Sequence, residues 1–116
     1  MSDLADMTAV EMAQAVRSRV VSPVELVDAV LDRIEERADL NAFITVTEKE
    51  ARSAARDAED AVMRGVDLPP LHGVPYSVKD LLNTAGIRTT MGSLLFENHV
   101  PDSDAVTVSR AQSAGA

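Results

Sequence analysis

Lys79 is the side chain of this sequence best placed to do chemistry. It comes near the end of the run 71–80, Leu-His-Gly-Val-Pro-Tyr-Ser-Val-Lys-Asp, which predicts a strand over about 73–79. On that strand Lys79 would share a face with Ser77, while Asp80 would face the opposite way. Ligands of α/β sheets collect at the carboxyl ends of strands. A lysine acts as a base only when neutral, so burial or a nearby cation would have to lower its pKa from ~10.4. The alternative is a strand-end lysine that pairs with a carboxylate.

Three other groupings could do chemistry, and each has a plainer interpretation. Ser77 and Lys79 would lie ~7 Å apart along a strand, unlike the Ser-x-x-Lys of penicillin-binding enzymes, where both groups share a helical turn. His72 could be drawn into a Ser-His-Asp triad, but a histidine beside Gly73 at a strand entry is typical of a structural position. His99 could suggest a metal site with nearby carboxylates, but a polar surface loop holds no such groups on one face. Those carboxylates belong to Glu97, Asp102 and Asp104.

The elements that would position Lys79 are mainly helices with capping signals. Thr8 and Ser22 each precede a glutamate by three residues, which is the spacing of a capping box. Thr47 and Asp104 are expected to cap two further helices, and Gly115 to end the last one. The predicted helices span about 8–19, 22–38, 47–64 and 104–113, and the predicted strands span about 42–46 and 73–79. Two strands do not make an independently stable sheet, so the topology predicts that the sheet is incomplete in this chain.

Composition excludes several classes of protein. The chain has 116 residues, 46% of them hydrophobic, which is not a disordered composition, but only 3% are aromatic, so the core is thin. A net charge of −8 argues against direct binding of nucleic acid. The absence of cysteine excludes disulfides and thiolate sites. Without a signal-like start or a long apolar run, we expect a cytoplasmic protein that makes no contact with a membrane.

The run that contains Lys79 resembles the lysine segment of the amidase signature family. Several residue types match in order without a gap, and residues 86–93 are similar to that family's Gly-x-x-Thr-Thr-x-Gly-Ser stretch. The resemblance implies an α/β fold, with a mixed sheet between layers of helices. It also implies that residues 1–116 are the N-terminal fragment of a single amidase domain. Further stretches that fit are 22–27, 40–45, 101–105 and 114–116.

The same resemblance implies amide hydrolysis through an acyl-enzyme, with Lys79 as the terminal base of a Ser–cis-Ser–Lys triad. The loop of Met91, Gly92 and Ser93 would border the acyl part of a small-molecule amide substrate. No cofactor and no metal are implied. The family's two serine-bearing, glycine-rich stretches are absent from this sequence. The remainder of the amidase domain would have to supply them, and this fragment alone should be inactive.

Two alternatives stay open at this stage. One is the A subunit of glutamyl-tRNA amidotransferase, although proteins of that kind often carry Cys-Ala-Ser where this chain has Met91-Gly92-Ser93, which favours a free-standing amidase. The other is an inactive or split fragment that docks onto a serine-bearing partner, for which an exposed sheet edge would be suited. The sequence identifies neither the amide nor the oligomeric state, and a homo-oligomer is possible.

Overall fold

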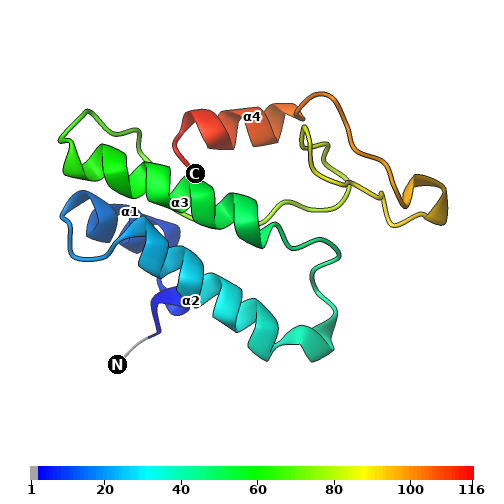
Figure 1. Ribbon diagram of the computed structural model, residues 1–116, viewed down its shortest axis with the longest axis horizontal. Helices are drawn as coiled ribbons and strands as arrows, with labels where there is room; N and C mark the ends of the chain where they lie inside the picture. The colour runs from blue at the N-terminus through cyan, green and yellow to red at the C-terminus, as the bar shows by residue number, and fades with distance from the viewer. Residues whose placement is uncertain (1–2) are drawn as a thin grey trace.

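The computed structural model describes residues 3–116, and its regular structure is helical (Figure 1). Helix α3 lies along α2 on one side, and α4 lies on the other side of the molecule. A long irregular segment joins α3 to α4 and carries Lys79. No helix within residues 3–116 has the length and apolar character needed to cross a bilayer. The α-helices are α1 (Ala9–Arg17), α2 (Pro23–Glu36), α3 (Glu48–Met63) and α4 (Val106–Ser113), and the short 3-10 helices are η1 (Leu4–Asp6), η2 (Ala38–Leu40) and η3 (Leu94–Phe96).

Both predicted capping boxes are present. The hydroxyl of Thr8 accepts from the Glu11 amide at 3.2 Å, and the Glu11 carboxylate accepts from the Thr8 amide at 2.7 Å. At the start of α2 the hydroxyl of Ser22 accepts from the Val24 amide at 3.0 Å, and the Ser22 amide donates to Glu25 at 3.2 Å. Each box satisfies amides that have no partner inside the helix, which is why these two helices begin where the sequence predicts.

The other two predicted caps are wrong. Thr47 precedes α3 but its side chain makes no capping bond. Helix α4 begins after Ala105, two residues later than predicted, and Asp104 does not cap it. The carboxylate of Asp104 accepts instead from the backbone amide of Ala85 at 2.7 Å. The Asp104 carboxylate is therefore bound to a distant part of the chain and is not available to cap α4.

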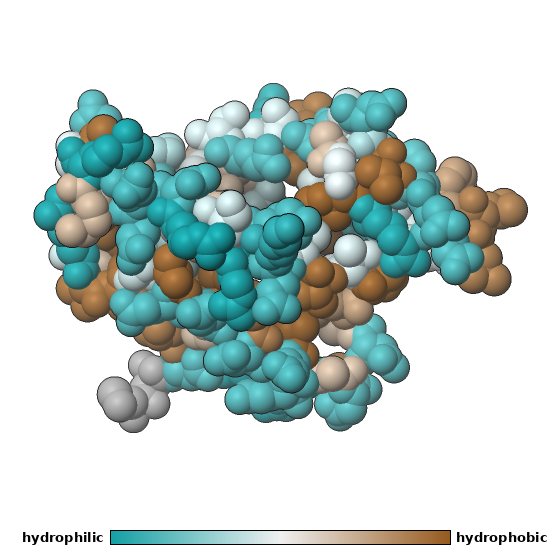
Figure 2. Space-filling view, viewed as in Figure 1, coloured by the Kyte–Doolittle hydropathy of each residue, from teal (hydrophilic) through white to brown (hydrophobic). Residues whose placement is uncertain are grey.

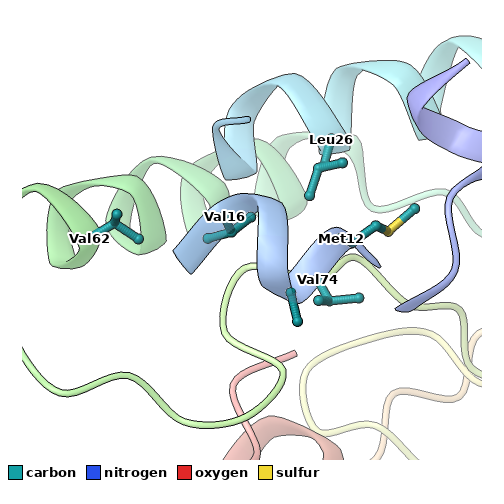
Figure 3. Packing of buried hydrophobic residues seen from close by; sticks show 6 residues of the cluster. Met12, Val16, Leu26, Val62 and Val74 are labelled. Atoms are coloured by element: carbon teal, nitrogen blue, oxygen red, sulfur yellow. The ribbon is translucent and has the colours of Figure 1, made fainter. Parts of the chain in front are cut away.

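The core lies where α1, α2, α3 and the segment leading to Lys79 meet (Figure 3). Leu26 of α2 is fully buried, and Val62 of α3 packs into the same cluster. Val74 brings the start of the predicted lysine strand into this core. The cluster comprises Met12, Ala13, Val16, Leu26, Val62 and Val74, all aliphatic and mostly small, as the low aromatic content predicts.

Neither predicted strand forms within residues 3–116. Segments 42–46 and 73–79 carry no strand, and the one isolated bridge among the described residues joins Thr84 to Ile87. A strand is defined by a ladder to a neighbour, and the backbone amides of residues 76–79 donate no hydrogen bond to any described residue. The mixed sheet therefore stays a prediction for a longer polypeptide.

The end of α4 packs against the entry to the lysine segment. The amide of Leu71 donates to the carbonyl of Ala114 at 2.7 Å, and the amide of Gly73 donates to the carbonyl of Gly115 at 3.1 Å. Gly115 has φ +101°, and a Cβ built there would lie 2.7 Å from the Cα of His72. Only glycine allows the two backbones to approach this closely.

Candidate functional site

Lys79 lies on an extended stretch with its side chain exposed. Its amine makes no hydrogen bond and no ion pair with any of residues 3–116. Ser77 is also exposed, whereas Val74 at the start of the stretch is buried. The burial that would lower the pKa of Lys79 is therefore not provided by residues 3–116. The physical reason is the missing sheet, because no described strand flanks the segment and covers this side chain.

The carboxylate of Asp80 binds the loop that follows and forms no ion pair with Lys79. Its carboxylate accepts from the Thr90 amide at 2.8 Å and also from the Thr90 hydroxyl. Its backbone carbonyl accepts from the Met91 amide at 2.9 Å. The Thr90 hydroxyl and amide lower the pKa of the Asp80 carboxyl below its usual value, with smaller contributions from the Gly92 amide and the Arg88 guanidinium. The carboxylate is thus held in its charged form.

The loop predicted to border the substrate is a tight turn. The amide of Ser93 donates to the carbonyl of Thr90 at 2.9 Å, which closes a four-residue turn. Met91 and Gly92, at its centre, have φ +57° and +67°, the left-handed pair of a type I′ turn. The Gly92 amide donates to the Thr90 hydroxyl at 3.2 Å, and Thr90 is only 4% exposed. The turn is therefore fixed internally as well as through Asp80.

An apolar tip follows the turn directly. Ser93 caps η3 by accepting from the Leu95 amide at 3.2 Å. Leu94 and Leu95 are 88% and 91% exposed, so they bury almost nothing against the described residues. Figure 2 shows apolar surface at the far end of the molecule, where Figure 1 places this part of the chain. In these surroundings the two leucines are free to contact another surface.

Neither histidine takes part in a catalytic or metal-binding arrangement within residues 3–116. The His72 Nε2 lies 2.9 Å from the carbonyl oxygen of Ala58 in α3, which is a structural contact. The ring of His99 packs edge-on against Phe96, with centroids 5.7 Å apart. No group of three or more carboxylate, histidine or cysteine side chains in the described residues could hold a metal ion.

Sequence reasoning recognised Lys79 and the loop of residues 91–93 but missed what connects them. Strand alternation indicated only that Asp80 faces away from Lys79. The structure shows that Asp80 spans ten residues to Thr90. The one available signal was an aspartate followed by a pair of threonines, and such a pair is too common to be specific.

Comparison with known proteins identifies the family. The Amidase family profile matches residues 25–116. The chain belongs to the amidase family. This confirms the resemblance seen in the lysine run and in residues 86–93, and members of this family are hydrolases that act on carbon–nitrogen bonds.

Two relatives are A subunits of glutamyl-tRNA(Gln) amidotransferase. The protein from Carboxydothermus hydrogenoformans is 39% identical over 111 residues, covering 95% of this chain and 23% of that protein. The mitochondrial protein from Ornithorhynchus anatinus is 42% identical over 106 residues, covering 91% of this chain and 20% of that protein. The chain therefore spans less than a quarter of the relatives it matches. These relatives fit the amidotransferase alternative better than a free-standing amidase.

A solved structure supports the fold class. A bacterial aryl acylamidase of the amidase signature family matches with a TM-score of 0.90 and 27% identity, covering 99% of this chain and 24% of that one. Amidase signature enzymes have an α/β fold. The α/β class predicted from sequence is therefore that of the family, although the described residues of this chain contain helices only.

Proposed function

We propose that this chain supplies the lysine of an amide-hydrolysing enzyme that acts through an acyl-enzyme, and that the enzyme is an amidotransferase A subunit. The observation that carries the proposal is the 39–42% identity to such subunits over nearly the whole chain. An A subunit of this kind would release ammonia from glutamine for a partner subunit. The nucleophilic and bridging serines would come from polypeptide outside this sequence.

Lys79 is the proposed base. The amine is exposed and makes no ion pair among residues 3–116, so serines from elsewhere can reach it. The burial that a neutral amine requires would come from the same outside polypeptide. The neighbouring carboxylate of Asp80 is bound to Thr90 and therefore does not hold Lys79 in an ion pair. Met91, Gly92 and Ser93 are proposed to contact the substrate, because their turn is attached to the residue that follows Lys79.

A free-standing amidase is the second candidate. Its support is the Met91-Gly92-Ser93 sequence, together with the TM-score of 0.90 to an aryl acylamidase. The two candidates differ in substrate. Glutamine hydrolysis that depends on a partner subunit supports the amidotransferase, and hydrolysis of an aryl amide by the isolated protein supports the amidase.

The test uses the full-length protein with three substitutions at its lysines. Lys79→Ala should lower kcat at least ~100-fold, as removal of a positioned base does, and Lys79→Arg should be no better because guanidinium does not release its proton in this range. Lys49→Ala is the matched control, because Lys49 is the only other lysine of this sequence and is exposed on α3. Near-normal turnover in a folded Lys79→Arg variant would show that Lys79 is a positive charge and not the base.

A further inference from the structure

We propose that Asp80 is a positioning residue that holds the Met91–Gly92–Ser93 turn at a fixed place beside Lys79. The inference rests on the proposed function, since it assigns to Asp80 the task of aligning the substrate loop with the base. Asp80 itself touches neither the substrate nor the reacting atoms. It acts through Thr90, the first residue of the turn.

The hydrogen bonds around the turn single out Asp80. Residues 83–89 are attached to the returning chain, through the amide of Gly86 to the carbonyl of Pro101 at 3.0 Å and the amide of Thr89 to the carbonyl of His99 at 2.9 Å. None of these bonds reaches the lysine segment. Within residues 3–116, all hydrogen bonds between residues 74–82 and the turn involve Asp80. Without its carboxylate, one backbone bond to Met91 would remain.

The quality of these contacts supports a positioning role. Both carboxylate oxygens are used, one by the Thr90 amide and the other by the Thr90 hydroxyl. Thr90 is 4% exposed while Asp80 is half-buried, and bonds to a charged acceptor are stronger than neutral ones. The Thr90 hydroxyl also accepts from the Gly92 amide at 3.2 Å. Fixing Thr90 therefore also restricts Gly92, at the centre of the turn.

The arrangement also separates two opposite charges. Asp80 is the residue next to Lys79 in sequence, yet no ion pair forms between them. A carboxylate that is already bound by the turn leaves the lysine amine available to a serine. Asp80 therefore has two effects on Lys79. It holds the substrate loop beside the amine, and it forms no ion pair with the amine.

The test compares Asp80→Ala with Asp104→Ala in the full-length enzyme. Asp104 is the matched control because its carboxylate also accepts a backbone amide bond in this region, from Ala85 at 2.7 Å, but makes none to the turn. Asp80→Ala should raise KM about tenfold and lower kcat less, because a loosened loop loses binding in the ground state and the transition state alike. Asp104→Ala should leave KM within about twofold, as expected for a residue that does not touch the turn.

Substitutions at Thr90 keep the proposal testable if Asp80→Ala fails to fold. Thr90→Ser keeps the hydroxyl and should keep KM, whereas Thr90→Val removes it and should raise KM. An unchanged KM in folded Asp80→Ala and Thr90→Val would overturn the proposal, and so would an equal rise in Asp104→Ala.

Amide hydrogen exchange separates failure of this proposal from failure of the proposed function. If the wild-type protein hydrolyses no amide, the proposed function is wrong, but exchange at Thr90 and Met91 still reports on the attachment. It should become faster in Asp80→Ala and stay unchanged in Asp104→Ala. Unchanged exchange in Asp80→Ala would overturn the positioning role whatever the activity.

Discussion

Replacing Gly115 by alanine tests the close packing between the end of α4 and the entry to the lysine segment. The new Cβ would lie 2.7 Å from the Cα of His72 and 2.7 Å from the Cγ of Pro69. Ordinary contacts of a Cβ begin at 3.4 Å. The two backbones would therefore have to separate by 3.4 − 2.7 = 0.7 Å, which strains the bonds from Leu71 to Ala114 and from Gly73 to Gly115.

The expected cost has two parts. A residue with a side chain pays ~1–2 kcal/mol in a left-handed conformation, and Gly115 has φ +101°. Forcing a methyl group into a packed site adds ~1–3 kcal/mol. We therefore expect Gly115→Ala to lower the free energy of unfolding by ~2–5 kcal/mol, which is a large share of a typical domain's stability.

Gly65→Ala is the matched control. Gly65 also follows a helix, α3, and has φ +71°, but a Cβ built there meets nothing within 4 Å. It should therefore pay the conformational cost alone, ~1–2 kcal/mol. The difference between the two variants isolates the packing term.

Urea-induced unfolding, followed by the helical circular dichroism signal, measures both variants against the wild type. Hydrogen exchange at the amides of Leu71 and Gly73 provides a local reading, and it should become faster in Gly115→Ala only. Equal destabilisation by the two substitutions would refute the reasoning, because it would mean that the segments do not approach closely. Normal protection of the Leu71 amide in Gly115→Ala would refute it as well.

Three further predictions concern single side chains. Leu95→Ser should change the free energy of unfolding, measured with urea, by less than ~0.5 kcal/mol, because the side chain is 91% exposed. A large loss of stability would mean that the tip is buried. Ser22→Ala should lower the free energy of unfolding, measured with urea, by ~1 kcal/mol, because it removes a helix cap. Thr47→Ala should lower it little, because Thr47 makes no capping bond. Equal losses in the two variants would contradict the capping assignment. The hydrogen bonds between Asp80 and Thr90 should be lost in acid. The pKa of the Asp80 carboxyl in the folded protein lies below the ordinary 3.8. The stabilisation is therefore present above pH 3.8 and disappears as the pH falls through the folded pKa. The Thr90 amide chemical shift should report this transition, and a shift that moved only between pH 5 and 7 would be the contrary result.

Helix starts show which local signals were sufficient. The capping boxes at Thr8 and Ser22 were predicted correctly because each involves residues three apart, whose interaction needs no other part of the chain. Asp104 had the right type for a cap, but its carboxylate binds the amide of Ala85, nineteen residues earlier. A local rule cannot anticipate a partner that only the fold brings near.

The predicted strands show the reverse case. Segments 42–46 and 73–79 have strand composition, but strand structure depends on a hydrogen-bonded neighbour, and the described residues offer none. The exposure of Lys79 has the same origin. The residue pattern can indicate that a segment is suited to a sheet, but a strand forms only where a neighbouring strand is present.

The sequence by itself determined the family, the candidate base Lys79, the candidate loop at residues 91–93 and the two capped helix starts. These depend on residue types in a fixed order, which the chain carries whatever its conformation. The tertiary structure alone decided that Asp80 binds Thr90 and that the end of α4 meets the entry to the lysine segment. Such contacts join residues that are distant in sequence, and they form only because burial of the aliphatic core and turn geometry bring those backbones together.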